Sequence, residues 1–209
     1  MTAIAVGTAV AAQGAVGVTP PSNALALFEG NDLAAWVDAQ DHPARWRVEE
    51  DHVTVEPGRG DIFTRRSFGD FQLHLEFWLP EMPEASGQDR ANSGIYLQGR
   101  YELQILDSFG MEPTDDGCGA LYKRAAPLWN ACRRPEVWQS LDVAFSSRRP
   151  DGPARLTAFL NGVLIHNNLA VPGPTGGAID DDESAPGPLR LQDHGCRVRY
   201  RNVWIVPAG

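Results

Sequence analysis

The stretch that decides the fold reads NSGIYLQGRYELQILDS and runs from Asn92 to Ser108. Apolar and polar residues alternate along both of its halves, which predicts a pair of β-strands. Strict alternation puts Glu102 and Gln104 on one face of the second strand and Asp107 on the other. Asp107 joins the first two side chains only if a β-bulge inserts one residue between Gln104 and Asp107.

Short alternating segments continue through the rest of the chain and favour an all-β fold. Residues 71–79, FQLHLEFWL, put apolar side chains on one face and a polar set on the other, a pattern typical of a core face and a ligand-facing or half-solvated face. Asn161-Gly162 lies between two apolar runs and predicts a hairpin, because both turn positions tolerate positive φ. About a dozen short strands without a long helical period predict a jelly-roll β-sandwich, with a barrel as the main alternative.

Other local features are less regular. A short helical turn is expected near Trp36, and two closing strands are expected around a turn at His194-Gly195. Residues 108–138 form a long irregular segment, but Leu121, Tyr122, Leu128 and Trp129 indicate that it packs against the domain. Residues 172–188, rich in Gly, Pro and acidic side chains, are expected to be solvated.

Length and charge exclude several classes of protein. Residues 23–209 are expected to form one domain, since all-β sandwiches commonly reach this size without splitting. The formal net charge of -9 repels phosphate backbones and no basic stripe offsets it, which argues against nucleic-acid binding. Kinase, zinc protease and hydride-transfer activities have no motif support, because the chain has no P-loop, H-E-x-x-H or dinucleotide fingerprint.

Residues 1–22 are small, apolar and uncharged. They are similar to the apolar region of a secretory leader but lack its basic start, so we interpret them as a leader remnant or a flexible tail. The segment is too weakly hydrophobic for a transmembrane helix, and no membrane span is expected.

The three cysteines, Cys118, Cys132 and Cys196, have no metal-binding spacing. They are interpreted as buried small hydrophobes. A bridge between Cys118 and Cys132 is the main competing interpretation if the compartment is oxidising.

Glu102, Gln104 and Asp107 form an E-x-Q-x-x-D cluster. Paired carboxylates on one sheet face can divide the roles of acid and base, because burial and mutual repulsion separate their pKa values. The competing interpretation is a solvated strand edge. Amide, guanidinium and aromatic side chains suit sugar binding and support the site, and they are present nearby as Tyr96, Gln98 and Arg100.

A second constellation comprises Arg190, Gln192, Asp193 and His194. Histidine is suited to proton transfer near neutrality, although a histidine before glycine is also a common turn residue. Weaker candidates are His74 and Glu76 on the polar face of residues 71–79, Tyr122, and Trp138 as a stacking platform or a core residue. The polar face of 71–79 and the turn at Gln192–His194 are expected beside Asn92–Ser108, as parts of one sugar groove.

Five segments together resemble the DUF1080 family, also called the 3-keto-disaccharide hydrolase domain. They are NSGIYLQGRYELQILDS, CGALYKRAAP, VWQSLDVAF, LNGVLIHNN and LRLQDHGCRVRYRNVWI, within residues 24–206. The resemblance implies a concanavalin/LamG-like jelly roll with a concave sugar-binding face, periplasmic or extracellular in location. It also implies a small carbohydrate substrate, a glycoside already oxidised to a ketone at C3.

The E-x-Q-x-x-D run is also similar to the E-x-D-x-x-E signature of jelly-roll endoglucanases, but it differs at Gln104 and Asp107. Retaining glycosidases need two carboxylates about 5 to 5.5 Å apart, so the loss of the middle acid weakens this alternative. A glycan-binding module without catalysis is the other alternative, since the fold alone does not imply chemistry.

A C3 ketone acidifies the hydrogen at C2, so one base can form an enolate that expels the C1 substituent, after which water adds. We assign His194 or Glu102 as the base and Asp107 near the leaving atom. The expected substrate-binding side chains, which include the enolate donors, are Arg100, Gln104, Gln192, Tyr96, Gln98 and Tyr122. No cofactor is assigned, although a divalent cation held by Glu102, Asp107 and His194 is possible.

Overall fold

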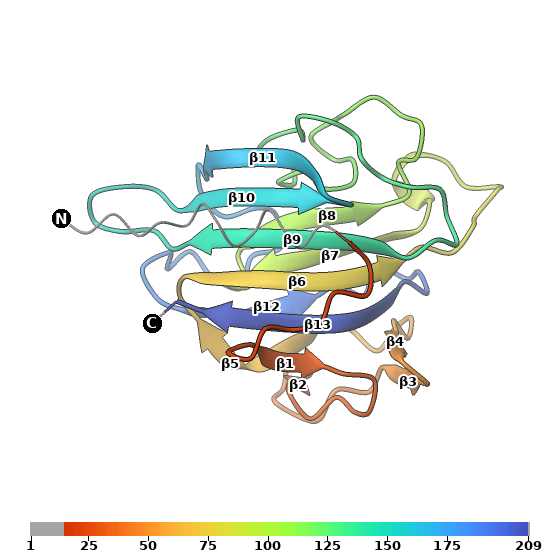
Figure 1. Ribbon diagram of the computed structural model, residues 1–209, viewed down its shortest axis with the longest axis horizontal. Helices are drawn as coiled ribbons and strands as arrows, with labels where there is room; N and C mark the ends of the chain where they lie inside the picture. The colour runs from red at the N-terminus through yellow and green to blue at the C-terminus, as the bar shows by residue number, and fades with distance from the viewer. Residues whose placement is uncertain (1–14, 209) are drawn as a thin grey trace.

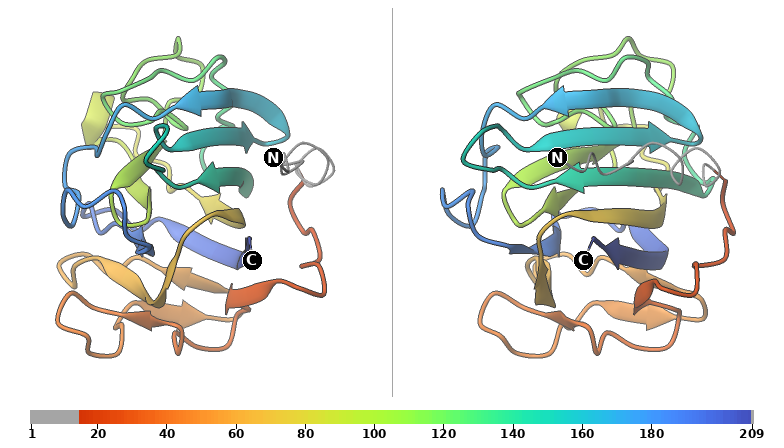
Figure 2. Two further views of the ribbon diagram at one scale, coloured as in Figure 1. Left: turned by 90° about the vertical axis from the view of Figure 1, so that its left-hand side faces the viewer. Right: turned by 60° about the vertical axis from the view of Figure 1, so that its left-hand side comes forward.

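The computed structural model of the protein describes residues 15–208 and shows two antiparallel sheets packed face to face (Figures 1 and 2). The larger sheet has the order β11-β10-β9-β6-β13-β4-β3, with β1 also paired to β13, and the smaller has the order β2-β5-β12-β7-β8. This architecture confirms the predicted all-β jelly-roll sandwich and excludes the barrel.

The elements, in chain order, are β1 (Leu25–Phe28), β2 (Trp36–Val37), β3 (Arg47–Glu49), β4 (His52–Thr54), β5 (Ile62–Phe68), β6 (Phe71–Trp78), the 3-10 helix η2 (Gly87–Asp89), β7 (Asn92–Leu97), β8 (Tyr101–Leu106), β9 (Gln139–Ser146), β10 (Arg155–Leu160), β11 (Val163–Ala170), β12 (Gly187–Leu191) and β13 (Arg199–Pro207). Within residues 15–208, no helix is long and apolar enough to cross a membrane.

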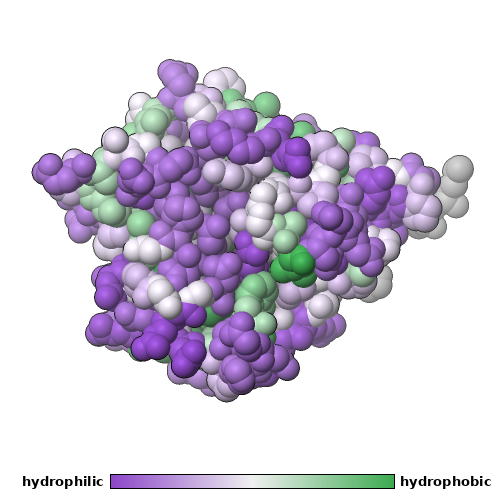
Figure 3. Space-filling view, turned by 180° about the vertical axis from the view of Figure 1, so that it is seen from behind, coloured by the Kyte–Doolittle hydropathy of each residue, from purple (hydrophilic) through white to green (hydrophobic). Residues whose placement is uncertain are grey.

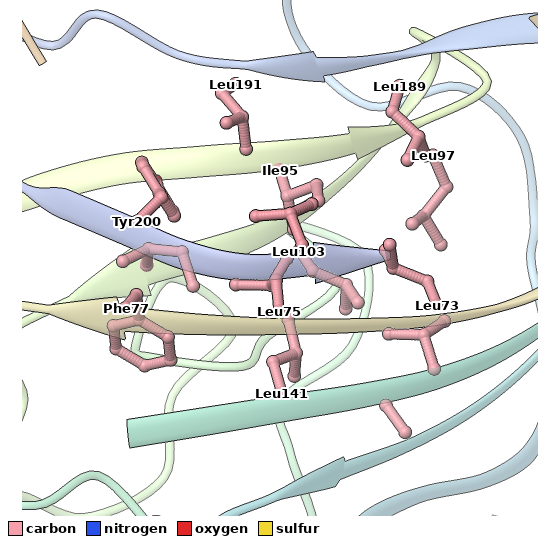
Figure 4. Close-up of a cluster of buried hydrophobic side chains, with 14 of the residues drawn as sticks. Leu73, Leu75, Phe77, Ile95, Leu97, Leu103, Leu141, Leu189, Leu191 and Tyr200 are labelled. Atoms are coloured by element: carbon pink, nitrogen blue, oxygen red, sulfur yellow. The ribbon is translucent and has the colours of Figure 1, made fainter. Parts of the chain in front are cut away.

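The core lies between the two sheets, where alternate side chains of each strand point inward. Leu73 and Leu75 of β6 face Ile95 and Leu103 of β7 and β8 across this layer (Figure 4). All four are at least 98 % buried. Burial of a large aliphatic side chain contributes about 1.5–3 kcal/mol, so this layer is the main source of stability for the sandwich.

The predicted strand pair at Asn92–Ser108 is β7 and β8, joined through Gln98 and Gly99, both at positive φ. The predicted hairpin at Asn161-Gly162 is also present, between β10 and β11, and both residues have positive φ. These two turns are confirmed because their backbone geometry is set by the residues at the turn itself.

Three local predictions are confirmed only in part. The expected turn is a single one at residues 34–35, closed by the Trp36 N–H on the Leu33 carbonyl at 2.8 Å, and Trp36 itself begins the short strand β2. The two predicted closing strands are present as β12 and β13 on either side of the His194-Gly195 turn, and they belong to different sheets. Leu128 and Trp129 are 55 % and 66 % exposed, although Leu121 of the same segment is fully buried. Backbone hydrogen bonds join residues 119–122 of this segment to the outer edge of β8. The segment therefore covers an edge strand that would otherwise be exposed.

Candidate functional site

A row of aligned side chains crosses the outer face of the smaller sheet. Arg190 of β12 is in register with Tyr96 of β7, and Tyr96 is in register with Glu102 of β8. Directly aligned side chains on one face of antiparallel strands lie close together. The strand parity of the sequence therefore brings a cation, a phenol and a carboxylate side by side on this face.

The Glu102 carboxylate lies at the end of this row. The Tyr96 hydroxyl donates a hydrogen bond of 2.8 Å to Glu102 Oε2. Gly94 faces the same carboxylate, and a Cβ atom at this position would overlap with Glu102 Oε1. The glycine in the N-S-G-I-Y run therefore leaves the space in which the carboxylate sits.

Arg190 lies at the other end of this row and contacts the Tyr96 ring. Its guanidinium carbon lies 3.4 Å from the centroid of the Tyr96 ring. Its Nε lies 3.2 Å from Asp61 Oδ2, and its Nη1 donates to the Gly177 carbonyl at 2.6 Å. The guanidinium is thus held by an aromatic face, a carboxylate and a loop carbonyl. We interpret Arg190 as a positioning residue for Tyr96 and for the Gly177 loop.

A pocket of about 240 Å³ opens above Glu102. Its lining comes from both sheet and loops and comprises Gln88, Asn92, Tyr96, Glu102, Gln104, Tyr122, Gly176, Gly177, Gln192 and His194. The face of the molecule opposite to that of Figure 1, where the smaller sheet lies, is largely hydrophilic (Figure 3). A polar pocket of this size on a hydrophilic face suits one small polar ligand.

Two loops complete the pocket. The Gly176 carbonyl oxygen lies 3.0 Å from the Tyr96 hydroxyl oxygen, and Thr175 Oγ1 accepts a hydrogen bond of 2.9 Å from the Glu102 backbone N–H. On the edge of β8, the Tyr122 N–H donates to the Glu102 carbonyl at 3.0 Å. Glu102 is therefore fixed by hydrogen bonds of its backbone N–H and carbonyl as well as by the hydrogen bond of its side chain.

Three amide oxygens of the lining have free acceptor capacity. Asn92 Oδ1, Gln104 Oε1 and Gln192 Oε1 are buried and accept no hydrogen bond from any residue in the described part of the chain. The amide nitrogens of Asn92 and Gln104 are both directed to Gln88, at 2.9 Å and 3.0 Å. A buried acceptor without a partner is costly, so these oxygens favour a ligand that carries several hydroxyl donors.

Burial raises the pKa of Glu102 to about 7, and the nearby Asp61 carboxylate acts in the same direction. The Tyr96 hydrogen bond and the Arg190 charge lower the pKa but do not offset burial. Burial and the neighbouring Glu102 charge raise the pKa of Tyr96 above its usual range, so its phenol stays protonated and remains a donor. The pocket therefore holds a carboxyl group that exchanges its proton near neutral pH.

The pocket brings together six of the predicted site residues: Tyr96, Glu102, Gln104, Tyr122, Gln192 and His194. Glu102 and Gln104 are 97 % and 99 % buried, which excludes the solvated strand edge. His194 is exposed at the rim, in the turn after β12.

Asp107 does not reach the pocket. The pairing of β7 with β8 is regular from Asn92 to Leu97, so there is no bulge within β8, which ends at Leu106. By strand alternation Asp107 lies on the same inward face as Leu103 and Ile105. Its Oδ2 lies 2.5 Å from Arg90 Nη2. The prediction that Asp107 acts beside the leaving atom does not fit this geometry.

Arg100 and Gln98 also lie outside the pocket. The Arg100 guanidinium pairs with both carboxylate oxygens of Asp180, at 2.6 Å and 3.1 Å. Gln98 Nε2 donates to the Phe68 carbonyl and to Ser147 Oγ. Both side chains hold loops in place and do not face a ligand, which corrects their predicted role in substrate binding.

The predicted cation ligands Glu102, Asp107 and His194 do not form one group, because Asp107 is directed away from the other two. Across residues 15–208, no cluster of three or more His, Cys, Asp and Glu side chains is arranged to hold a metal ion.

Sequence reasoning missed Gln88, Asn92, Gly176 and Gly177. Asn92 could have been found, because it lies two residues before Gly94 and four before Tyr96 and therefore shares their face. The two glycines lie in the loop at residues 172–188, which was expected to be solvated. Their position beside the pocket depends on contacts with residues distant in the sequence, such as the hydrogen bond from the Thr175 N–H to the Arg100 carbonyl.

A second buried glutamate lies on the outer face of the larger sheet. Glu76 of β6 accepts hydrogen bonds from Arg201 Nε at 2.8 Å, from Asn202 Nδ2 at 3.0 Å and from the Gly17 N–H at 2.5 Å. His74 lies beside it, with Nδ1 2.7 Å from Asp142 Oδ1. Burial alone would raise the pKa of Glu76, but these partners hold it at about 2.

This cluster corrects the expected position of the polar face of residues 71–79. The apolar face of β6 points into the core, so His74 and Glu76 point to the outside of the larger sheet, away from Glu102. Residues 15–24, which lead into β1, cross this face (Figure 1), and the Asn202 amide holds them by donating to the Val18 carbonyl at 2.9 Å. The two polar faces belong to separate sites.

Solved structures with the same arrangement define the class of protein. A candidate glycosyl hydrolase from Parabacteroides distasonis ATCC 8503 is 36 % identical, with a TM-score of 0.82 over 91 % of this chain and 86 % of that one. Two others from the same organism, at 21 % and 18 % identity, have TM-scores of 0.66 and 0.61. They cover 90 % and 87 % of this chain and 95 % and 98 % of their own, and they share the fold.

The family model of the 3-keto-alpha-glucoside-1,2-lyase-like domain matches residues 23–206. The chain therefore belongs to this family, as the resemblance in the sequence indicates. A comparison with curated proteins found no match. Family membership and the hydrolase-like neighbour give the protein a carbohydrate-active role.

Proposed function

We propose that the protein cleaves the glycosidic bond of 3-keto-glycosides by elimination followed by addition of water. The observation that carries this proposal is the buried Glu102 carboxyl, with a pKa of about 7, on the floor of a polar pocket that holds one carboxylate. A base with a pKa near the working pH is well suited to remove the C2 proton next to a ketone.

In the first step Glu102 takes the C2 proton, the electron pair moves into the C3 carbonyl, and an enolate forms. The Gln192 amide nitrogen, whose contact to Tyr96 Oη is 3.5 Å, is the donor available to the enolate oxygen. The enolate then expels the C1 substituent, and His194 or Tyr122 at the pocket wall supplies a proton to the leaving oxygen. Water then adds to C1 and its second proton restores His194 or Tyr122, while Glu102, whose proton has exchanged with solvent, protonates C2.

The free amide oxygens of Asn92, Gln104 and Gln192 support a hydroxyl-rich ligand, because each can accept from a sugar hydroxyl. The retaining glycosidase alternative has less support. It requires two carboxylates about 5 to 5.5 Å apart across the scissile bond, and Glu102 is the single acidic side chain in the lining.

The test is a time course with a 3-keto-disaccharide in heavy water, followed by NMR. The proposal predicts free 3-keto-sugar with enzyme-dependent deuterium at C2, above the exchange seen without enzyme. Product without label at C2 would favour direct displacement. Tight binding without product over hours would favour a glycan-binding module.

Two variants test the residues. Glu102→Gln should abolish both label and product, and His194→Ala should lower the rate of product release. Glu81→Gln, an exposed glutamate outside the pocket, is the matched control and should keep full activity. Full activity in Glu102→Gln would remove the base from the mechanism.

A further inference from the structure

The segment that brings Tyr122 to the pocket carries two cysteines at its ends. Cys118 and Cys132 are 99 % and 93 % buried, and both belong to the hydrophobic core. Both are free thiols in this structure. They are 14 positions apart in the sequence, so their proximity is a property of the folded segment.

Backbone and side-chain bonds hold the two cysteines around the same point of β8. The Cys118 N–H donates to Ser108 Oγ at 3.2 Å, and the Cys132 N–H donates to Asn130 Oδ1 at 3.1 Å. The Ser108 hydroxyl in turn donates to Asn130 Oδ1 at 3.2 Å. One short network therefore connects both cysteine backbones.

The two thiols are also neighbours. Cys132 Sγ lies 3.5 Å from the Leu106 carbonyl, two residues before the Ser108 hydroxyl that accepts from the Cys118 N–H. The proximity of the two thiols raises the pKa of Cys118 and lowers that of Cys132. Cys196 lies elsewhere, with its sulfur against Met82 and the Arg90 carbonyl.

We propose that Cys118 and Cys132 form a disulfide under oxidising conditions and that this bond staples the segment carrying Tyr122 to the edge of β8. During folding, the Cys132 thiolate attacks a low-molecular-weight disulfide such as oxidised glutathione and releases one thiol. The Cys118 thiolate then attacks the mixed disulfide, and the second small thiol leaves. Two protein thiols are oxidised, and one small disulfide is reduced to two thiols.

The bond closes a loop that includes residues 119–122, which pair with the edge of β8. Closing a loop of this length lowers the entropy of the unfolded chain, so the oxidised protein should be more stable. The expected gain is on the order of 10 °C in Tm for a domain of this size. Because this inference concerns the scaffold, it can be tested without a substrate.

The experiment is refolding of the full chain from denaturant in a buffer of reduced and oxidised glutathione, followed by thiol titration and tryptic mapping without reductant. Trypsin cuts after Lys123 and Arg124, so Cys118 and Cys132 fall in separate peptides, 101–123 and 125–133. We expect these two peptides to be linked, one titratable thiol at Cys196, and a higher Tm that reductant abolishes.

Cys196→Ala is the control and should retain both the link and the Tm difference. Cys118→Ala with Cys132→Ala should remove the Tm difference between oxidised and reduced samples, and the wild-type comparison stands even if this double variant folds poorly. Three free thiols after oxidative refolding, a bridge to Cys196, or equal Tm values in the two redox states would each overturn the proposal.

Discussion

Glu102 and Glu76 are both buried glutamates on outer faces of the sandwich, one on each sheet, yet their pKa values move in opposite directions. Interactions with His74 and Asn202, and then with the Gly17 N–H and Arg201, hold the pKa of Glu76 at about 2 despite its burial. Burial raises the pKa of Glu102 to about 7, because its carboxylate is bonded to the Tyr96 phenol while the Arg190 guanidinium stacks on the Tyr96 ring.

The difference shows how one side chain serves two purposes. A buried carboxylate paired with a guanidinium keeps its charge at all physiological pH values and acts as a structural anchor. A buried carboxyl that is bonded to a phenol, with the nearest cation stacked on the phenol ring, can take up and release a proton near neutrality. Both glutamates are buried, so the number and kind of polar partners around each carboxyl separate the candidate base from the anchor.

The largest expected effect is on turnover. Glu102→Gln should lower the rate of 3-keto-disaccharide cleavage by about 10³-fold, in line with the loss of a general base. Glu76→Gln should leave the rate per folded molecule unchanged, because Glu76 lies on the other sheet. Initial rates, corrected for folded fraction by circular dichroism, measure this contrast. Equal losses in both variants would mean that the two glutamates do not differ in role.

The next effect concerns the seat of the Glu102 carboxylate. Gly94→Ala places a Cβ atom against Glu102 Oε1 and should reduce kcat by about 10²-fold, the usual cost of a displacement of about 1 Å in a catalytic group. Gly152→Ala is the matched control, because a Cβ atom there meets no other atom and the backbone is not left-handed. Unchanged kcat in Gly94→Ala would show that the carboxylate position is not critical.

The pH dependence of the reaction follows from the raised pKa of Glu102. The base must be ionised, so kcat/KM should fall tenfold for each pH unit below about 7 and level off above it. A pH–rate profile with 3-keto-disaccharide provides the measurement. A profile that is flat down to pH 5 would contradict the assignment of Glu102 as the base.

Stability should respond to the two glutamates with opposite signs. A raised pKa means that ionisation of Glu102 opposes folding, a cost that grows from pH 4.5 to about 7, so Glu102→Gln should stabilise the protein above pH 7. A lowered pKa means that Glu76 stabilises the fold above pH 4.5 and loses this effect as pH falls toward 2, so Glu76→Gln should destabilise it.

Each effect is on the order of 3 kcal/mol at pH 8, since a shift of one pKa unit corresponds to about 1.4 kcal/mol. Urea unfolding of both variants at pH 8 and pH 4 measures them. The Glu102→Gln effect should vanish at pH 4, where the carboxyl is protonated in both states. Destabilisation by Glu102→Gln at pH 8 would show that the ionised Glu102 carboxylate stabilises the fold, which contradicts a raised pKa.

Much of this arrangement follows from strand alternation. The parity of residues 92–108 places Tyr96, Glu102 and Gln104 correctly on one face, because the period of two is a local property of the chain. The same rule excludes Asp107 once the strand is known to be regular. Whether a β-bulge is present depends on packing at the end of β8, where Asp107 meets Arg90, and alternation alone does not decide it.

The parts that could not be predicted depend on long-range contacts. Residues 71–78 alternate as expected, but the sheet to which their polar face belongs follows from pairing with β9 and β13. Gly176 and Gly177 approach Tyr96 because Arg100 holds Asp180 and because Thr175 bonds to the β8 backbone. These contacts join residues more than seventy positions apart in the sequence.

The most direct test is a 13C NMR titration of the side-chain carboxyl groups in glutamate-labelled protein, with Glu102→Gln and Glu76→Gln used to assign the two signals. The carboxyl signal of Glu102 should shift with a midpoint at about pH 7. The carboxyl signal of Glu76 should keep the chemical shift of the ionised form down to about pH 2. A Glu102 midpoint near 4.5, the value of an ordinary glutamate, would contradict the claim that this site holds a proton-exchanging base.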